Sequence, residues 1–185
     1  MLATLNRGDF GYDILLWIHI LTAIVGFGST FVWPALASRS RKLGNPVVSL
    51  EVSRMSLDLG HVLTTYFVYA VGVTGLILFG IGPWHTEAVS KTWIGIAILL
   101  YAIALTISLG FHLPNLRAML GLQEELGAMG PPPQSAGAAA GGPPPQVLEL
   151  QERGKRAGMY GGILHLLFAL ILLDMVFKPG FLYFH

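Results

Sequence analysis

Four long apolar runs with almost no charged residues constrain the fold of this sequence more than any other feature. They cover residues 14–38, 59–86, 92–116 and 157–177, and Asp174 in the fourth run is their one acidic or basic residue. Each run reaches the roughly 20 residues with which a helix crosses a hydrocarbon core about 30 Å thick. Because a helix satisfies its own backbone hydrogen bonds in lipid, the runs predict four membrane-spanning helices.

We therefore predict an all-α integral membrane protein, a single up-down four-helix bundle over residues 1–185. Its spans are expected at 14–37, 59–81, 92–113 and 157–177. The composition agrees, because 11% of the residues are charged, against about 25% in soluble proteins. A net charge of +1 without a basic patch predicts a lipid bilayer as the surroundings and no nucleic-acid partner.

Lysine and arginine are distributed unevenly between the two sides of such a bundle. Three of them lie on the side of the termini: Arg7, Lys91 and Lys178. Eight lie in or beside the other two connections: Arg39, Arg41, Lys42, Arg54, Arg117, Arg153, Lys155 and Arg156. The positive-inside rule then places both of those connections in the cytoplasm and both termini outside.

The connection between the third and fourth runs contains a segment rich in proline, glycine and alanine at 127–146. Proline removes backbone donors, and the small residues bury little surface, so we expect a flexible cytoplasmic linker there. The sequence after it, VLELQERGKR, is expected to start a helix that runs into the fourth span. The chain has no cysteine, which leaves histidine, methionine and carboxylate as metal ligands.

Each predicted span carries one histidine, and these are the candidate cofactor ligands: His19, His61, His112 and His165. Ionisable residues inside spans are functional candidates, and two neutral imidazoles from different helices can ligate the iron of haem b. Two histidines that share an iron atom must lie at similar depths in the membrane. His61 and His112 lie at similar depths, and the difference between His61 and His165 is still tolerable. A pair of His19 and His61 is disfavoured, because their depths differ more. The structural alternative is that each imidazole donates a hydrogen bond to a neighbouring hydroxyl or carbonyl group, and the available threonines are Thr22, Thr64, Thr65, Thr74 and Thr106.

Small residues accompany three of these histidines on their helical faces. His19, His61 and His165 share a face with glycine, alanine or threonine, which is typical of helix contacts in membranes. Asp174 lies nine residues beyond His165, so the two side chains point to opposite sides of the helix. We expect His165 inside the bundle, and Asp174 at the outer boundary, in reach of water beside Lys178 and at a depth similar to that of His19.

Other chemistry has little support in the sequence. There is no Ser/His/Asp order, phosphate-binding glycine loop, HExxH motif or pair of carboxylates within the spans. The methionines form no cluster for copper. We therefore expect no independent catalytic activity, and no metal other than haem iron.

Four short motifs together resemble a widespread bacterial family of small four-span predicted integral membrane proteins of unassigned function. They are WIHILTAIVGFGS, YAVGVTGLIL, LGFHLPNLRAM and LLDMVFKPG, one in or at the end of each span. The resemblance implies a multi-pass protein of the bacterial inner membrane. The first span is also similar to the copper-resistance protein D and bacterial membrane protoporphyrinogen oxidase groups, and the latter similarity implies that His19 contacts haem. Gly26-Phe27-Gly28 departs from the oxidase pattern, so its activity is not carried over.

Three functional hypotheses follow from these features. The first is a small b-type cytochrome-like protein that binds haem b through two span histidines and transfers electrons within or beside a respiratory or photosynthetic complex. The second is a cofactor-free accessory or assembly subunit of a larger membrane complex. The third is a small transporter, which requires an aqueous path between the spans.

Overall fold

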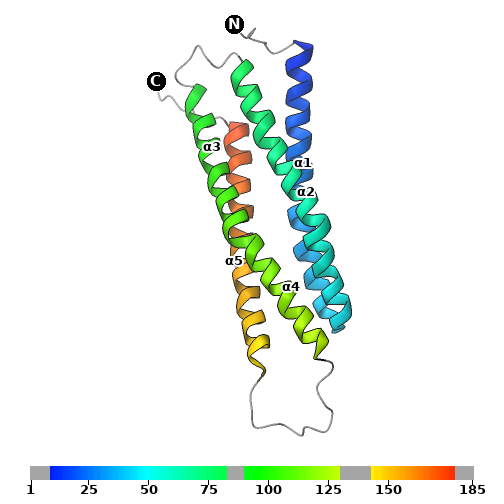
Figure 1. Ribbon diagram of the computed structural model, residues 1–185. Coiled ribbons are helices and arrows are strands. Elements are labelled where there is room, and N and C mark those ends of the chain that lie inside the picture. Colours follow the sequence, from blue (N-terminus) through cyan, green and yellow to red (C-terminus); the bar gives the residue numbers. More distant parts are fainter. Residues whose placement is uncertain (1–8, 83–89, 130–142, 178–185) are drawn as a thin grey trace, which may run out of the picture.

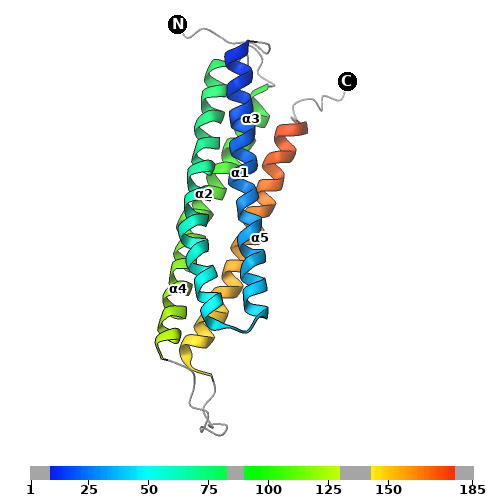
Figure 2. The same ribbon diagram turned by 90° about the vertical axis from the view of Figure 1, so that its right-hand side faces the viewer.

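The computed structural model describes residues 9–82, 90–129 and 143–177, except for the side chains of His61 and of residues 90–92, and this part of the chain is almost wholly helical. Its elements are α1 (Phe10–Lys42), α2 (Pro46–Ile81), α3 (Ser90–Ile107), the π-helical turn η2 (Ser108–His112), α4 (Leu113–Ala128) and α5 (Pro145–Phe177). Because α3, η2 and α4 are continuous, the chain forms four rods that lie side by side (Figures 1 and 2).

All four rods are long and apolar enough to cross a membrane, which confirms the predicted helical membrane bundle. Their candidate spans contain 33, 36, 36 and 33 residues, the third counted from Trp93 to Ala128. At 1.5 Å per residue each of these helices is about 50 to 54 Å long, well beyond a core of about 30 Å. The additional turns include the charged start of α5, so the helix predicted from VLELQERGKR is present and continuous with the fourth span.

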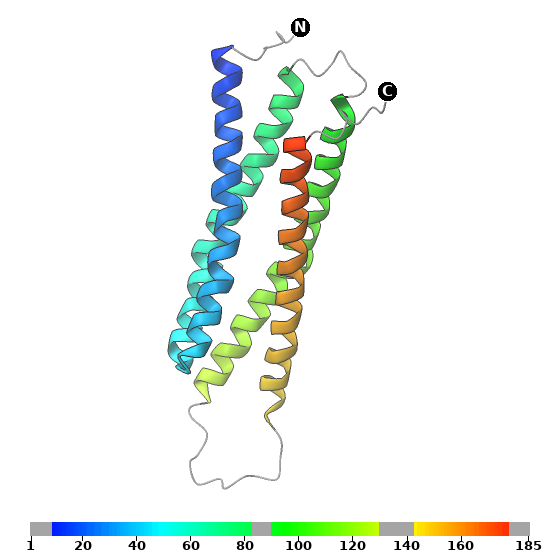
Figure 3. The same ribbon diagram turned by 180° about the vertical axis from the view of Figure 1, so that it is seen from behind.

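The start of α1 and the end of α5 lie at one end of the bundle, and the turn between α1 and α2 lies at the other (Figure 3). That turn is short because Gly44 adopts a φ of 65°, a left-handed conformation that glycine tolerates without strain. The side chain of Asn45 then accepts hydrogen bonds from the backbone N–H groups of Val47 and Val48, and Pro46 starts α2.

Helices α1 and α2 pack along most of their length, and α5 packs against α3, η2 and α4. Small residues make the closest approaches: a Cβ added at Gly26 would lie 3.1 Å from the Cβ of Phe67 and 3.2 Å from the backbone nitrogen of Val68. Few large side chains are buried, and many leucines, isoleucines and valines are exposed on the outside of the bundle. That distribution suits a protein whose outer surface contacts lipid.

The third rod does not end near His112 and Pro114, as the sequence predicts, but continues to Ala128. The π-helical turn η2 lies directly before the proline, and the N–H group of Leu113 donates to the carbonyl of Ser108, five residues earlier. Proline inside a regular helix lacks a donor and clashes with the preceding turn. A wider turn at this point relieves that conflict and lets the helix continue.

The linker predicted at 127–146 is shorter in the structure than in the sequence analysis. Gly127 and Ala128 belong to the last turn of α4, and α5 already begins at Pro145. Proline is well suited to this first helical position, because its N–H group would have no partner there. Residues 130–142 lie outside the described part of the chain.

Candidate functional site

His19 projects from α1 towards α2 and is fixed there by a threonine. Its Nδ1 atom lies 2.9 Å from the hydroxyl oxygen of Thr74. That hydroxyl has one hydrogen, which it donates to the backbone carbonyl of Ala70 at 2.6 Å. In the tautomer that carries the proton on Nδ1, the threonine oxygen accepts from His19 and the lone pair is on Nε2.

Glycine makes the space for this imidazole. A Cβ added at Gly75 would lie only 3.1 Å from Cε1 of His19, so the ring occupies the position that a larger side chain on α2 would take. The hydrogen bond with Thr74 is one of those that the structural alternative in the sequence analysis proposed. It is also the arrangement of a typical metal-ligating histidine, in which one ring nitrogen donates to the protein and the other faces the metal.

His165 on α5 is held in a different way, against α1. Its Nε2 atom lies 3.1 Å from the hydroxyl oxygen of Thr30, and its ring stacks on Phe31 with a centroid distance of 4.1 Å and an angle of 7°. The hydroxyl of Thr30 donates to the carbonyl of Phe27, and it accepts from His165 in the tautomer that carries the proton on Nε2. The lone pair is then on Nδ1, next to the ring's attachment to the main chain.

His112 is the last residue of the π-helical turn in the third rod. Its ring is edge-on to Tyr160 of α5, with ring centroids 6.4 Å apart, and its Nδ1 atom is buried without a hydrogen-bond partner. The backbone of His61 lies in α2, next to Gly60, which packs against Trp33 of α1. The side chain of His61 lies outside the described residues.

The described histidines occupy two levels of the bundle. His165 bonds to Thr30, eleven residues after His19 on α1, so the two imidazoles are separated by about 16 Å along the helix axis. His112 faces Tyr160, five residues before His165, which places it roughly 7 Å further from the end of the bundle at which α1 starts. Among the described histidines His19 alone lies near that end, at what we call the outer level, and the level of Thr30 and His165 is the inner level. His19 therefore cannot share an iron atom with His165.

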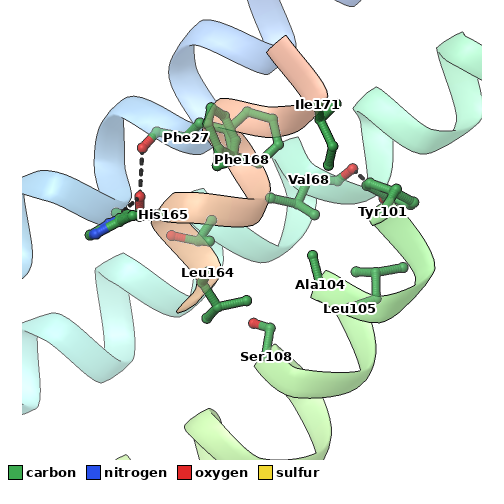
Figure 4. A pocket seen from close by; sticks show the side chains of 12 residues that line it. Phe27, Val68, Tyr101, Ala104, Leu105, Ser108, Leu164, His165, Phe168 and Ile171 are labelled. Carbon is green, nitrogen blue, oxygen red and sulfur yellow. Dashed lines mark hydrogen bonds between the residues drawn. The ribbon is translucent and has the colours of Figure 1, made fainter. Parts of the chain in front are cut away.

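A small cavity lies between these two levels, where all four rods meet (Figure 4). Its volume is about 60 Å³ and its lining is almost wholly apolar; of the described histidines only His165 contributes to it. Pockets that hold drug-sized ligands have about 300 Å³ or more. A porphyrin does not fit into this cavity, so the cavity is not a haem site. The described residues also contain no cluster of three or more His, Asp or Glu side chains suited to a metal ion.

Two features of this region differ from the sequence analysis. Asp174, expected at the boundary in reach of water, is 4% exposed. Two glycines that share the helical face of His165 have open space beside them: a Cβ added at Gly158 or Gly162 would meet no atom within 4 Å in the described structure. The sequence analysis missed the bonding of His165 to Thr30, because the rotation of α5 against α1 depends on packing.

These observations define an α-helical, multi-pass membrane protein built as a four-span bundle. The chain belongs to the DUF2269 family, described as predicted integral membrane proteins, whose family match covers residues 13–130 and thus α1 to α4. Neither the curated proteins nor the solved structures yield a match. Similarity to the copper-resistance and oxidase groups stays a prediction from the sequence.

Proposed function

We propose that this protein is a small b-type cytochrome-like membrane protein in which His19 ligates the iron of haem b. The observation that supports the proposal is the hydrogen bond between Nδ1 of His19 and Thr74, because an imidazole that donates through Nδ1 has its lone pair on Nε2. Nε2 is the nitrogen that histidine most readily offers to iron when Nδ1 is held by the protein. The resemblance of the first span to the membrane oxidase group independently implies the same residue.

The chain's own residues then have distinct roles. His19 supplies the ligand, Thr74 fixes its tautomer and ring orientation, and Gly75 provides the space in which the ring lies. A haem bound here supplies one-electron transfer, which suits a component of a respiratory or photosynthetic membrane complex. His165, whose Nε2 donates to Thr30, holds α5 against α1 and is not a ligand in this proposal.

An absorption spectrum of the purified protein, oxidised and reduced, tests the proposal. After expression with haem supplementation we expect a Soret band that shifts on reduction and is lost in His19→Ala. His165→Ala is the matched control, because it removes another hydroxyl-bound span imidazole and should keep the band. Thr74→Val should weaken haem binding by about 10- to 100-fold, as is usual when a partner of a metal ligand is lost.

Two results would contradict the proposal. One is a protein without Soret absorbance or bound iron even after supplementation. The other is a band that survives in His19→Ala and disappears in His165→Ala, which would move the ligand to the inner level.

A cofactor-free accessory subunit is the second candidate, and one observation favours it. The hydrogen bonds of His19 and His165 each join two helices, α1 to α2 and α1 to α5, as purely structural histidines would. This candidate predicts a featureless visible spectrum in the presence of haem and copurification with a defined membrane complex. In that case His19→Ala should lower stability and leave the spectrum unchanged.

A further inference from the structure

Asp174 is a buried carboxyl group for which the proposed function has no role. It lies on α5, three residues before the helix ends at Phe177, and is 4% exposed. Both of its carboxyl oxygens are buried and have no hydrogen-bond partner, and no ion pair involves it within the described part of the chain. Buried carboxylates are normally paired or hydrogen-bonded, so this group needs an explanation.

The register between α1 and α5 gives the depth of Asp174. Thr30 bonds to His165, and Phe27 packs against Phe168, so the two antiparallel helices are aligned at these positions. Asp174 is nine residues beyond His165, which places it level with the residue nine before Thr30, position 21 of α1. That is within one turn of His19. The carboxyl group therefore lies at the outer level of the bundle.

The described side chains around this level include no lysine or arginine. On α3, which packs against α5 (Figure 3), the buried residues here are Trp93, Ile94 and Ala97, and none of them titrates. On α1 the titratable groups are Tyr12, Asp13 and His19. The imidazole of His19 is bonded to α2 through Thr74, and no lysine or arginine occurs among the described residues of this end.

An ionised carboxylate in such surroundings is unstable. Burial of an unpaired charge costs several kcal/mol, and a group in this position becomes neutral instead. We propose that Asp174 is a proton-binding site: at neutral pH it is a neutral carboxylic acid, and it exchanges its proton with the aqueous phase at the nearby end of α5. The proposal does not depend on haem binding.

Infrared spectroscopy of the full chain in lipid nanodiscs tests this assignment without any cofactor. At pH 7 we expect the carbonyl band of a protonated carboxylic acid in the wild type and its loss in Asp174→Asn. Asp13→Asn is the matched control, because Asp13 is an exposed carboxylate on α1 and its removal should leave the band unchanged. Transfer to D₂O should shift the band, which would demonstrate exchange with water.

Four results would overturn the proposal. They are the absence of the band at pH 7, its persistence in Asp174→Asn, a band that does not shift in D₂O, and a band that disappears on addition of sodium ions. The last result would mean that the site binds a metal cation. If Asp174→Asn does not fold, the same spectrum is recorded of wild-type protein labelled with ¹³C at its aspartate carboxyl groups. The label should shift the band, and a band that does not shift would belong to another residue type.

Discussion

Gly26 is the position at which the packing of α1 on α2 is most sharply testable. A methyl group in Gly26→Ala would lie 3.1 Å from the Cβ of Phe67, 3.2 Å from the nitrogen of Val68 and 3.3 Å from the backbone carbon of Phe67. Two of these three atoms belong to the backbone, so they cannot move away by a change of rotamer. The two helices must separate locally.

The expected cost follows from two opposing effects. Overpacking of a tight contact costs about 1 to 3 kcal/mol, while replacing glycine by alanine inside a helix gains at most about 1 kcal/mol. Subtracting that gain from the cost leaves a net destabilisation of the bundle by Gly26→Ala of up to about 2 kcal/mol. Gly28→Ala is the matched control on the same helix, because its added methyl group would meet nothing within 4 Å in the described structure.

Unfolding of the purified variants in mixed micelles measures this difference. Sodium dodecyl sulfate is added in steps, and helicity or tryptophan fluorescence is followed. Gly26→Ala should unfold at a lower detergent fraction than the wild type, and Gly28→Ala at an equal or higher one. Equal midpoints for the two variants would refute the reasoning, because they would show that the α1–α2 contact tolerates a methyl group at its closest point.

Three further variants test contacts between other helices with the same unfolding assay. Tyr101→Phe removes the hydrogen bond from the Tyr101 hydroxyl to the carbonyl of Val68, at 2.7 Å, and should cost about 0.6 kcal/mol, the average for such bonds in a membrane protein. Asn115→Ala removes a buried amide that donates to the carbonyl of Arg153, and should cost about 1 to 3 kcal/mol. Arg54→Ala removes an exposed ion pair between α2 and α4, so we expect a loss below about 1 kcal/mol that vanishes at high salt; a larger or salt-independent loss would contradict this.

The helical membrane fold was predictable because it follows from one-dimensional properties of the chain. The length of the apolar runs sets the number of spans, and this is independent of how the helices rotate against each other. The ends of the rods were less predictable. The third span was predicted to end at residue 113, but the π-helical turn before Pro114 accommodates the proline ring and the helix continues to Ala128. Only the packed structure reveals such a turn.

The faces of the helices were predictable only in part. Gly26, Gly72 and Gly75 lie at close helix contacts, as small residues in membranes usually do. The same reasoning applied to Gly158 and Gly162 was wrong, because these positions have open space beside them. A small residue permits close packing but does not require it. Which permitted contact forms depends on the whole set of helix rotations and tilts, which no single face determines.

The two proposals meet at the outer level of the bundle. His19 and Asp174 lie within about one helical turn of each other in depth, on helices that the hydrogen bond between Thr30 and His165 joins. If His19 held a haem, reduction of its iron would add an electron in a medium of low dielectric constant, where an unbalanced charge is costly. A carboxylate at the same depth that takes up a proton would offset that cost, whereas a carboxyl group that is already neutral would not. If both proposals hold, the midpoint potential of the haem should therefore depend on pH above the pH at which Asp174 ionises, and this dependence should weaken in Asp174→Asn while His165→Ala retains it.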